Sequence, residues 1–175
     1  MKLVLLSIFF IILVLFSCNQ NKENDTNNST EDTVHTKITE SDISKLKYLE
    51  FSLDSKTEKI IEKWDKYLEL ESIVAKIKKG DLSYLKDNNE VITNFIKDLK
   101  KTIPDTINTP SIEARITALE TKLYKLESLY NLTTTSKEDL KLTIKEFLEA
   151  VSNLNLQMNK KLEKDSRNIE KPSDL

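Results

Sequence analysis

The chain has 175 residues, of which 32% are charged and 38% are apolar, and its formal net charge is −2. This length suggests one domain, and the charge balance offers no basic excess for neutralising phosphates, so no nucleic-acid partner is expected. One glycine and three prolines are too few for the many tight turns of an all-β sandwich or barrel. Abundant Leu, Ile, Lys and Glu are typical of long helices.

Residues 1–17 have the pattern of a secretory signal peptide. Lys2 supplies a positive start, residues 3–16 form an apolar run, and Ser17 is the small residue expected before a cleavage site. The run is shorter than the ~20 residues that a membrane-spanning helix needs. The stretch "LVLFSCNQ" (13–20) then places Cys18, the only cysteine of the chain, just after this run.

The sequence "LFSC" (15–18) resembles the lipobox of bacterial lipoproteins, although Phe16 departs from the small residue commonest at its position. The resemblance implies that the Cys18 thiol receives a diacylglyceryl group, that the signal is removed, and that the new α-amine is acylated. The lone cysteine suits this role because it has no partner for an intramolecular disulfide. A free or buried cysteine is the alternative interpretation.

Residues 18–38 are expected to form a disordered tether behind the acylated cysteine. The segment is polar and rich in asparagine, so it has little apolar surface to bury. Fully extended, residues 19–37 of this segment would span ~60 Å at ~3.3 Å per residue. His35, the only histidine, lies in this segment and is expected to be solvated rather than to bind a ligand.

From residue 39 to residue 165, apolar residues recur at helical spacing and predict an all-α domain. The first periodic stretch covers residues 43–53, and Asp54 or Ser55 is expected to cap the next helix. A wide stripe over residues 60–77 includes Trp64 and Leu68, and Gly80 follows it where a left-handed residue ends a helix. Residues 91–103 form a third stripe. The loop "TIPDTINTP" comes next, where Thr109 is expected to cap a helix that begins at Pro110.

The last two helices have the clearest pattern. Apolar residues over 112–130 and over 140–158 follow alternating spacings of four and three, and the short link "NLTTTS" joins the two runs. Ser136 ends this link and Asp139 follows it three residues later, and the pair is similar to a capping box. A short connection between amphipathic helices predicts an antiparallel hairpin, and a parallel coiled-coil oligomer is the alternative. We therefore expect a monomeric up-and-down bundle of four to five helices over residues 39–165, followed by a frayed tail at 166–175.

No catalytic, cofactor or metal-ligand pattern stands out, so the chain is not expected to be an enzyme. Glu58 and Glu62 share a helix face and are expected to be solvated. Lysines gather at 76–79 and 97–101, near predicted helix ends, where cations suit the helix dipole. A ligand patch is the alternative role for these two clusters.

A loose lipobox, an Asn/Lys-rich tether and a helical Lys/Glu/Ile-rich domain resemble the surface lipoproteins of Borrelia spirochaetes. The phrase "IEARITALETKLYKLESLYN" (112–131) is similar to the factor H-binding lipoproteins of the relapsing-fever group. The resemblance implies a lipid-anchored protein of the outer membrane that faces the cell exterior and captures the host complement regulator factor H. It identifies no binding residue.

Two other functions remain open from the sequence. An adhesin for host matrix or glycosaminoglycan requires the two lysine clusters to converge on one face. A periplasm-facing lipoprotein is the third possibility. For a ligand site we favour the segment "GDLSYLKDNN" (80–89), where Tyr84 stands beside Lys86 and Asp87 as an aromatic anchor among polar groups. The stiff loop at 102–110 is the second candidate, and binding through a helix face is the alternative to both.

Overall fold

The computed structural model describes residues 37–167, which all belong to one compact unit. The signal sequence, Cys18, His35 and the tail from residue 168 lie outside the described residues. Four helices make up the bundle: α4 (Asp65–Lys78), α5 (Asn89–Lys101), α6 (Pro110–Asn131) and α7 (Lys137–Ser166). Two short helices, α2 (Glu40–Ser44) and α3 (Ser55–Ile61), precede them, and the 3₁₀ turn η1 (Ser83–Leu85) lies between α4 and α5.

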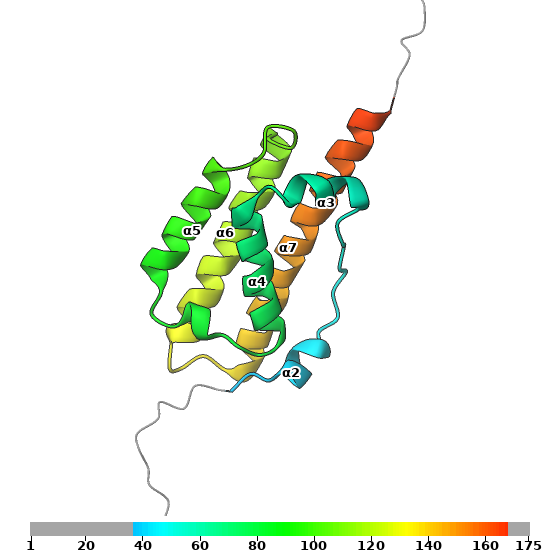
Figure 1. Ribbon diagram of the computed structural model, residues 1–175. Helices are drawn as coiled ribbons and strands as arrows, with labels where there is room; N and C mark the ends of the chain where they lie inside the picture. Colours follow the sequence, from blue (N-terminus) through cyan, green and yellow to red (C-terminus); the bar gives the residue numbers. More distant parts are fainter. Residues whose placement is uncertain (1–36, 168–175) are drawn as a thin grey trace, which may run out of the picture. The chain divides into compact units, whose positions relative to one another are not determined.

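The four main helices alternate in direction along the chain (Figure 1). The predicted all-α, up-and-down bundle is therefore confirmed, and the part of the chain that the structure describes contains no strand. The long antiparallel pair α6 and α7 forms its most extensive helix–helix contact. Of the apolar positions predicted for this hairpin, Tyr130 is only partly buried, and these are buried: Ile112, Ile116, Leu119, Leu123, Leu126, Leu140, Ile144, Phe147, Val151, Leu154 and Met158.

Several helix ends form where the sequence indicated them. Asp54 caps α3 by accepting the N–H groups of Lys56 and Thr57, and the Thr109 hydroxyl accepts the N–H of Ile112 at the start of α6. The Ser136 hydroxyl accepts the Asp139 N–H at 3.1 Å and begins α7. These side chains satisfy N–H groups that have no partner within the helix.

Gly80 ends α4 with φ +81, as its position predicted. A Cβ atom there would lie 3.0 Å from backbone atoms of Ile38, Thr39 and Glu40. The glycine therefore serves two purposes, because it adopts the left-handed conformation and lets the first described residues pack directly on the end of α4. Ile38, which the sequence analysis assigned to the tether, is buried in the core at this contact.

The periodic stretch at 43–53 is not one helix, contrary to the prediction. Helix α2 ends at Ser44, and residues 46–54 run as a non-helical segment beside α7 (Figure 1). Leu49, expected to face a core, is 76% exposed. Side chains of α7 supply hydrogen bonds to this segment, so tertiary contacts replace the backbone hydrogen bonds of a helix.

The stripe at 60–77 is also interrupted, because α3 ends at Ile61 and α4 begins at Asp65. Trp64 lies at the break and is 1% exposed, which confirms its expected place in the core. Its ring stacks on Tyr67 with centroids 5.5 Å apart, and its Nε1–H donates to the Thr102 hydroxyl at 3.1 Å. The change of direction between the two helices places the indole in the core.

Candidate ligand-binding surfaces

The favoured ligand segment connects α4 to α5 and has little freedom of its own. The Asp81 carboxylate accepts the Ser83 N–H at 3.0 Å and starts the turn η1, and the side chain of Leu85 is fully buried. These local contacts fix the backbone on both sides of Tyr84.

Tyr84 is a core-edge residue rather than a projecting anchor. Its ring is half-buried and meets Phe95 edge-on, with centroids 6.5 Å apart and planes at 86°. Among the described residues its buried hydroxyl has no hydrogen-bond partner. Burial, and secondarily the negative charge of Glu69, raise the pKa of Tyr84 to about 12. The phenol therefore stays neutral and offers a ligand only the exposed part of its ring.

Lys86 and Asp87 are exposed beside this tyrosine. Asp87 has φ 49, a left-handed conformation that aspartate tolerates better than most residues. Its N–H donates to Oδ1 of Asn131 at 3.1 Å, and Nδ2 of the same asparagine donates to the Leu85 carbonyl at 2.9 Å. The last residue of α6 therefore holds the backbone on both sides of Lys86 in place.

The second candidate loop, 102–110, lies at the opposite end of α5, and its last residue begins α6 (Figure 1). Ile103 and Ile107 point into the core, and the Ile107 N–H donates to the Pro104 carbonyl at 2.9 Å. This loop is thus anchored as well. The two candidate segments are at opposite ends of the bundle, as expected for connections that precede and follow the same helix, and cannot form one compact site.

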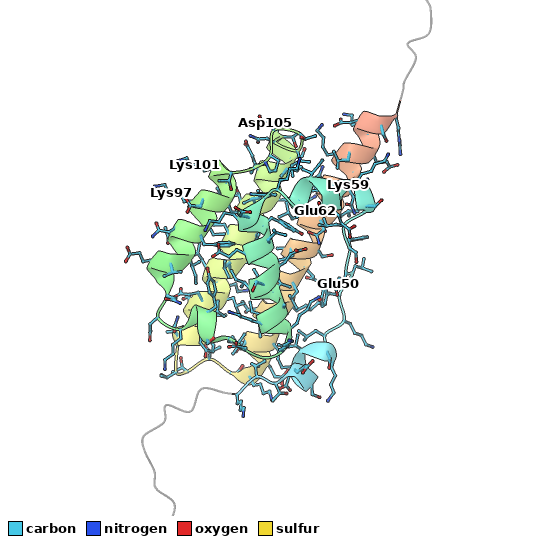
Figure 2. The ribbon with its side chains drawn as sticks, in the orientation of Figure 1. Glu50, Lys59, Glu62, Lys97, Lys101 and Asp105 are labelled. Atoms are coloured by element: carbon cyan, nitrogen blue, oxygen red, sulfur yellow. The ribbon has the colours of Figure 1, made fainter. Side chains whose placement is uncertain are left out.

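The two lysine clusters are separated in the same way. Residues 76–79 end α4, whereas Lys97 and Lys101 lie near the far end of α5, beside Asp105 (Figure 2). Two of these lysines are paired: Lys78 with Glu50, and Lys100 with Glu120 at 2.5 Å. The lysines do not converge into the single basic face that a glycosaminoglycan adhesin needs.

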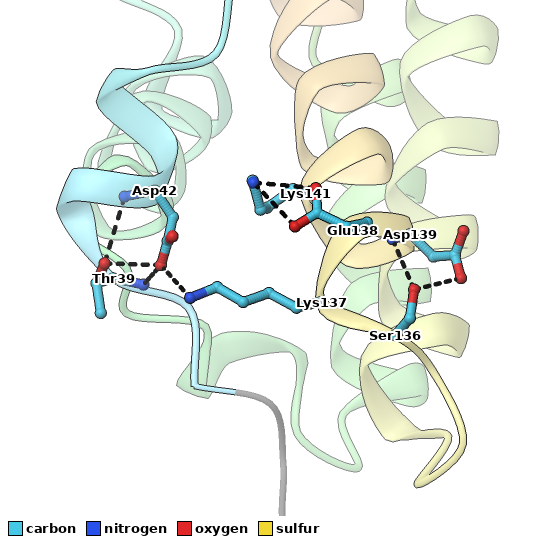
Figure 3. A network of polar contacts seen from close by, with 7 residues as sticks. All are labelled: Thr39, Asp42, Ser136, Lys137, Glu138, Asp139 and Lys141. Atoms are coloured by element: carbon cyan, nitrogen blue, oxygen red, sulfur yellow. Dashed lines mark hydrogen bonds and ion pairs between the residues drawn. The ribbon is translucent and has the colours of Figure 1, made fainter.

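A polar network joins α2 to the start of α7 (Figure 3). Thr39 and Asp42 form a reciprocal capping box, with the Thr39 N–H donating to Asp42 Oδ2 at 2.9 Å. The Lys137 ammonium lies 2.8 Å from the same oxygen. Hydrogen bonds from Lys137, and then from Thr39, lower the pKa of the Asp42 carboxyl far below its usual range. The network thus holds α2 against the start of α7.

One surface feature, an acidic groove, was not expected from the sequence. Glu58 and Glu62, expected to be simply solvated, line a groove of about 560 Å³ together with Glu50 and Glu71. The helix-face spacing of the first pair was visible in the sequence. The other two carboxylates come from the non-helical segment and from α4, so only the tertiary structure brings all four together.

Within residues 37–167, no group of three or more His, Cys, Asp or Glu side chains is arranged to hold a metal ion. None of the helices in this range is both long enough and apolar enough to cross a bilayer. Comparison with protein-family models, with curated proteins and with solved structures finds no significant match to the chain.

Proposed function

We propose that this chain is a lipid-anchored bacterial surface protein whose helical domain binds the host complement regulator factor H. The observation that carries the lipid anchor is the position of Cys18, the only cysteine, just after an apolar run in the lipobox-like sequence "LFSC", and the factor H part rests on the resemblance of residues 112–131. Cys18 would carry a diacylglyceryl group and an acylated α-amine, and more than one acyl chain gives stable membrane attachment, whereas a single chain gives only marginal binding. A domain anchored in this way holds bound factor H at the cell surface, where factor H protects the cell.

The helical domain supports a binding role through preorganisation. The exposed side chains of Lys86 and Asp87 are presented by a backbone that Asn131 holds in place. Binding through a segment that is already ordered costs less conformational entropy than binding through a free loop. We therefore assign the first contact to this segment, with the exposed part of the Tyr84 ring beside it.

Lipidation is tested by metabolic labelling with an alkyne palmitate analogue in a bacterium that processes lipoproteins. Wild-type chain should be labelled and Cys18→Ala should not, because the proposed acceptor thiol is gone. Equal labelling of the two chains would remove the lipoprotein assignment. Protease treatment of intact cells should remove the helical domain if it faces the exterior, and protection from protease would favour a periplasmic orientation.

Ligand binding is tested by surface plasmon resonance, with purified full-length chain in nonionic detergent passed over immobilised factor H. The variant Lys86→Ala/Asp87→Asn removes both charges of the proposed contact and should weaken binding about fivefold or more. Asparagine is chosen at position 87 because it tolerates the left-handed backbone there. The control Lys101→Ala/Asp105→Asn makes the same charge change at the opposite end of the bundle and should leave binding unchanged. Absence of binding by wild type would discard factor H, and loss only in the control would move the contact to the other end.

A further inference from the structure

A second surface, separate from the Tyr84 segment, has the features of a docking groove. It lies between residues 50–53 and helices α3 and α4, with α7 beneath, and has a volume of about 560 Å³. This volume falls within the ~300–1,000 Å³ of typical ligand pockets. Side chains of Leu53, Leu68, Val74 and Val151 give it an apolar floor, and Leu68 is 41% exposed there.

The rim of the groove is acidic. Glu58 and Glu62 come from α3 and its C-terminal cap, and Glu71 comes from α4. Among the described residues, none of these three carboxylates forms an ion pair. Lys78, the cation among the lining residues, is paired with Glu50. The rim therefore keeps an uncompensated negative charge beside an apolar floor.

The negative charges of these carboxylates also repel one another. Burial in the groove, and secondarily the charge of Glu58, raise the pKa of Glu71 above its usual value. A ligand that brings positive charge would relieve this repulsion, while an anionic or neutral polar ligand would not.

The groove is preformed because its outer wall is fixed to α7. The Ser152 hydroxyl accepts the Phe51 N–H at 2.8 Å, and Asn155 Nδ2 donates to the Phe51 carbonyl at 3.1 Å. Asn155 also accepts the Tyr67 hydroxyl from α4, so one amide links both walls of the groove. A ligand would not have to order these walls on binding.

We propose that this groove binds a cationic protein segment in which a leucine-sized apolar residue is flanked by lysine or arginine. The apolar side chain lies on the floor at Leu68, and the flanking cations pair with Glu62 and Glu71 at the rim. Arginine suits these positions because its planar guanidinium can bind a carboxylate through two parallel hydrogen bonds. This site is independent of the proposed factor H contact and uses different residues.

The test uses a fluorescein-labelled peptide of sequence GKRLRKG and purified full-length chain in nonionic detergent, followed by fluorescence anisotropy at low salt. We expect saturable binding that weakens as salt is added. Peptide GEELEEG should not bind, and GKRSRKG should bind more weakly because it lacks the apolar side chain.

The variant Glu62→Gln/Glu71→Gln should weaken peptide binding about fivefold or more, because two ion pairs are lost. The variant keeps the side-chain volumes and removes repulsion at Glu71, so circular dichroism should show an unchanged fold. The matched control Glu90→Gln/Glu113→Gln removes two exposed carboxylates outside the groove and should bind as wild type does.

Three results would overturn the proposal. The first is absence of peptide binding by wild type, and the second is an equal loss in the two double variants, which would indicate unspecific charge attraction. The third is self-association of wild type in sedimentation that Glu62→Gln/Glu71→Gln abolishes, since the occupant would then be a second copy of this chain.

Discussion

The hydroxyl of Ser152 in α7 accepts the backbone N–H of Phe51, 101 residues earlier in the chain, at 2.8 Å. The same hydroxyl donates to the Leu49 carbonyl at 2.8 Å. One turn further along α7, Asn155 Nδ2 donates to the Phe51 carbonyl. One turn beyond that, Asn159 Nδ2 donates to the Ser52 carbonyl and its Oδ1 accepts the Asp54 N–H. A row of polar side chains on one helix thus substitutes for the backbone partners that residues 49–54 would have in a helix or a sheet.

Replacing this hydroxyl should destabilise the domain. Ser152→Ala leaves the Phe51 N–H and the Leu49 carbonyl without this partner in a part-buried place, which costs about 0.5–1.5 kcal/mol of unfolding free energy. Urea denaturation followed by circular dichroism measures the change. Ser128→Ala, an exposed site on α6, should have no such cost because alanine is the better helix former. Equal stability of the two variants would show that the bonds to Phe51 and Leu49 contribute nothing.

The hairpin core gives a second prediction, with a control on the same helix. Phe147 of α7 is fully buried, so Phe147→Ala should lower the free energy of unfolding by about 3–5 kcal/mol through lost burial and a cavity. Leu142 of α7 is 53% exposed, and Leu142→Ala should cost much less. Thermal melting compares the two. A similar loss at both positions would mean that the assigned helix face is wrong.

Gly80 tests the contact between the end of α4 and the first described residues. Gly80→Ala forces a side chain into a left-handed conformation and places Cβ 3.0 Å from backbone atoms, so it should destabilise the domain by at least about 1 kcal/mol. Hydrogen exchange should show the greatest loss of protection in α2 and at the end of α4. Unchanged protection and stability would mean that residues 38–40 do not pack on this glycine.

Asp42 gives a prediction for pH dependence. Because its pKa is lower in the folded protein than in the unfolded chain, its contribution to stability is fully present above the unfolded value of ~3.9. The contribution is lost as the pH falls through the lower, folded value. An NMR titration of the carboxyl carbon should show this low midpoint, and Lys137→Met should raise it. Asp54, whose pKa is lowered by hydrogen bonds from Thr57, should titrate unchanged in that variant and serves as the control.

Variants at Tyr84 distinguish the contribution of ring packing to stability from that of hydrogen bonding. Its ring packs on Phe95 while its buried hydroxyl has no partner among the described residues, so Tyr84→Phe should keep or raise stability by up to ~1 kcal/mol. Tyr84→Ala removes the ring contact and should destabilise. Chemical denaturation distinguishes the two outcomes. A clear loss of stability in Tyr84→Phe would mean that the hydroxyl has a stabilising partner.

Periodicity predicted those elements whose apolar residues face the core along their whole length. Helices α6 and α7 have this property, and their burial follows the spacing of four and three residues. Local capping chemistry was equally visible, since Thr109, Ser136 and Asp54 act within three residues of their own positions. Gly80 was predictable as a helix end because few other residues adopt a positive φ at low cost.

The same pattern failed for residues 46–54, where leucines recur at helical spacing but the chain is not helical. Sequence periodicity measures only the local preference for a helix. It carries no information about Ser152, Asn155 and Asn159, which offer this segment hydrogen bonds from about a hundred residues away. Those partners satisfy the backbone in another conformation, and so tertiary contacts override local propensity.

The sequence by itself determined the all-α class and the hairpin, because the first depends on neighbours within a few turns of helix and the second on the short link between two helices. Only the tertiary structure decided that residues 46–54 run beside α7 without forming a helix, and that Glu62 and Glu71 share one groove. These relations depend on how separate elements pack, and packing is set by long-range contacts that no local pattern encodes.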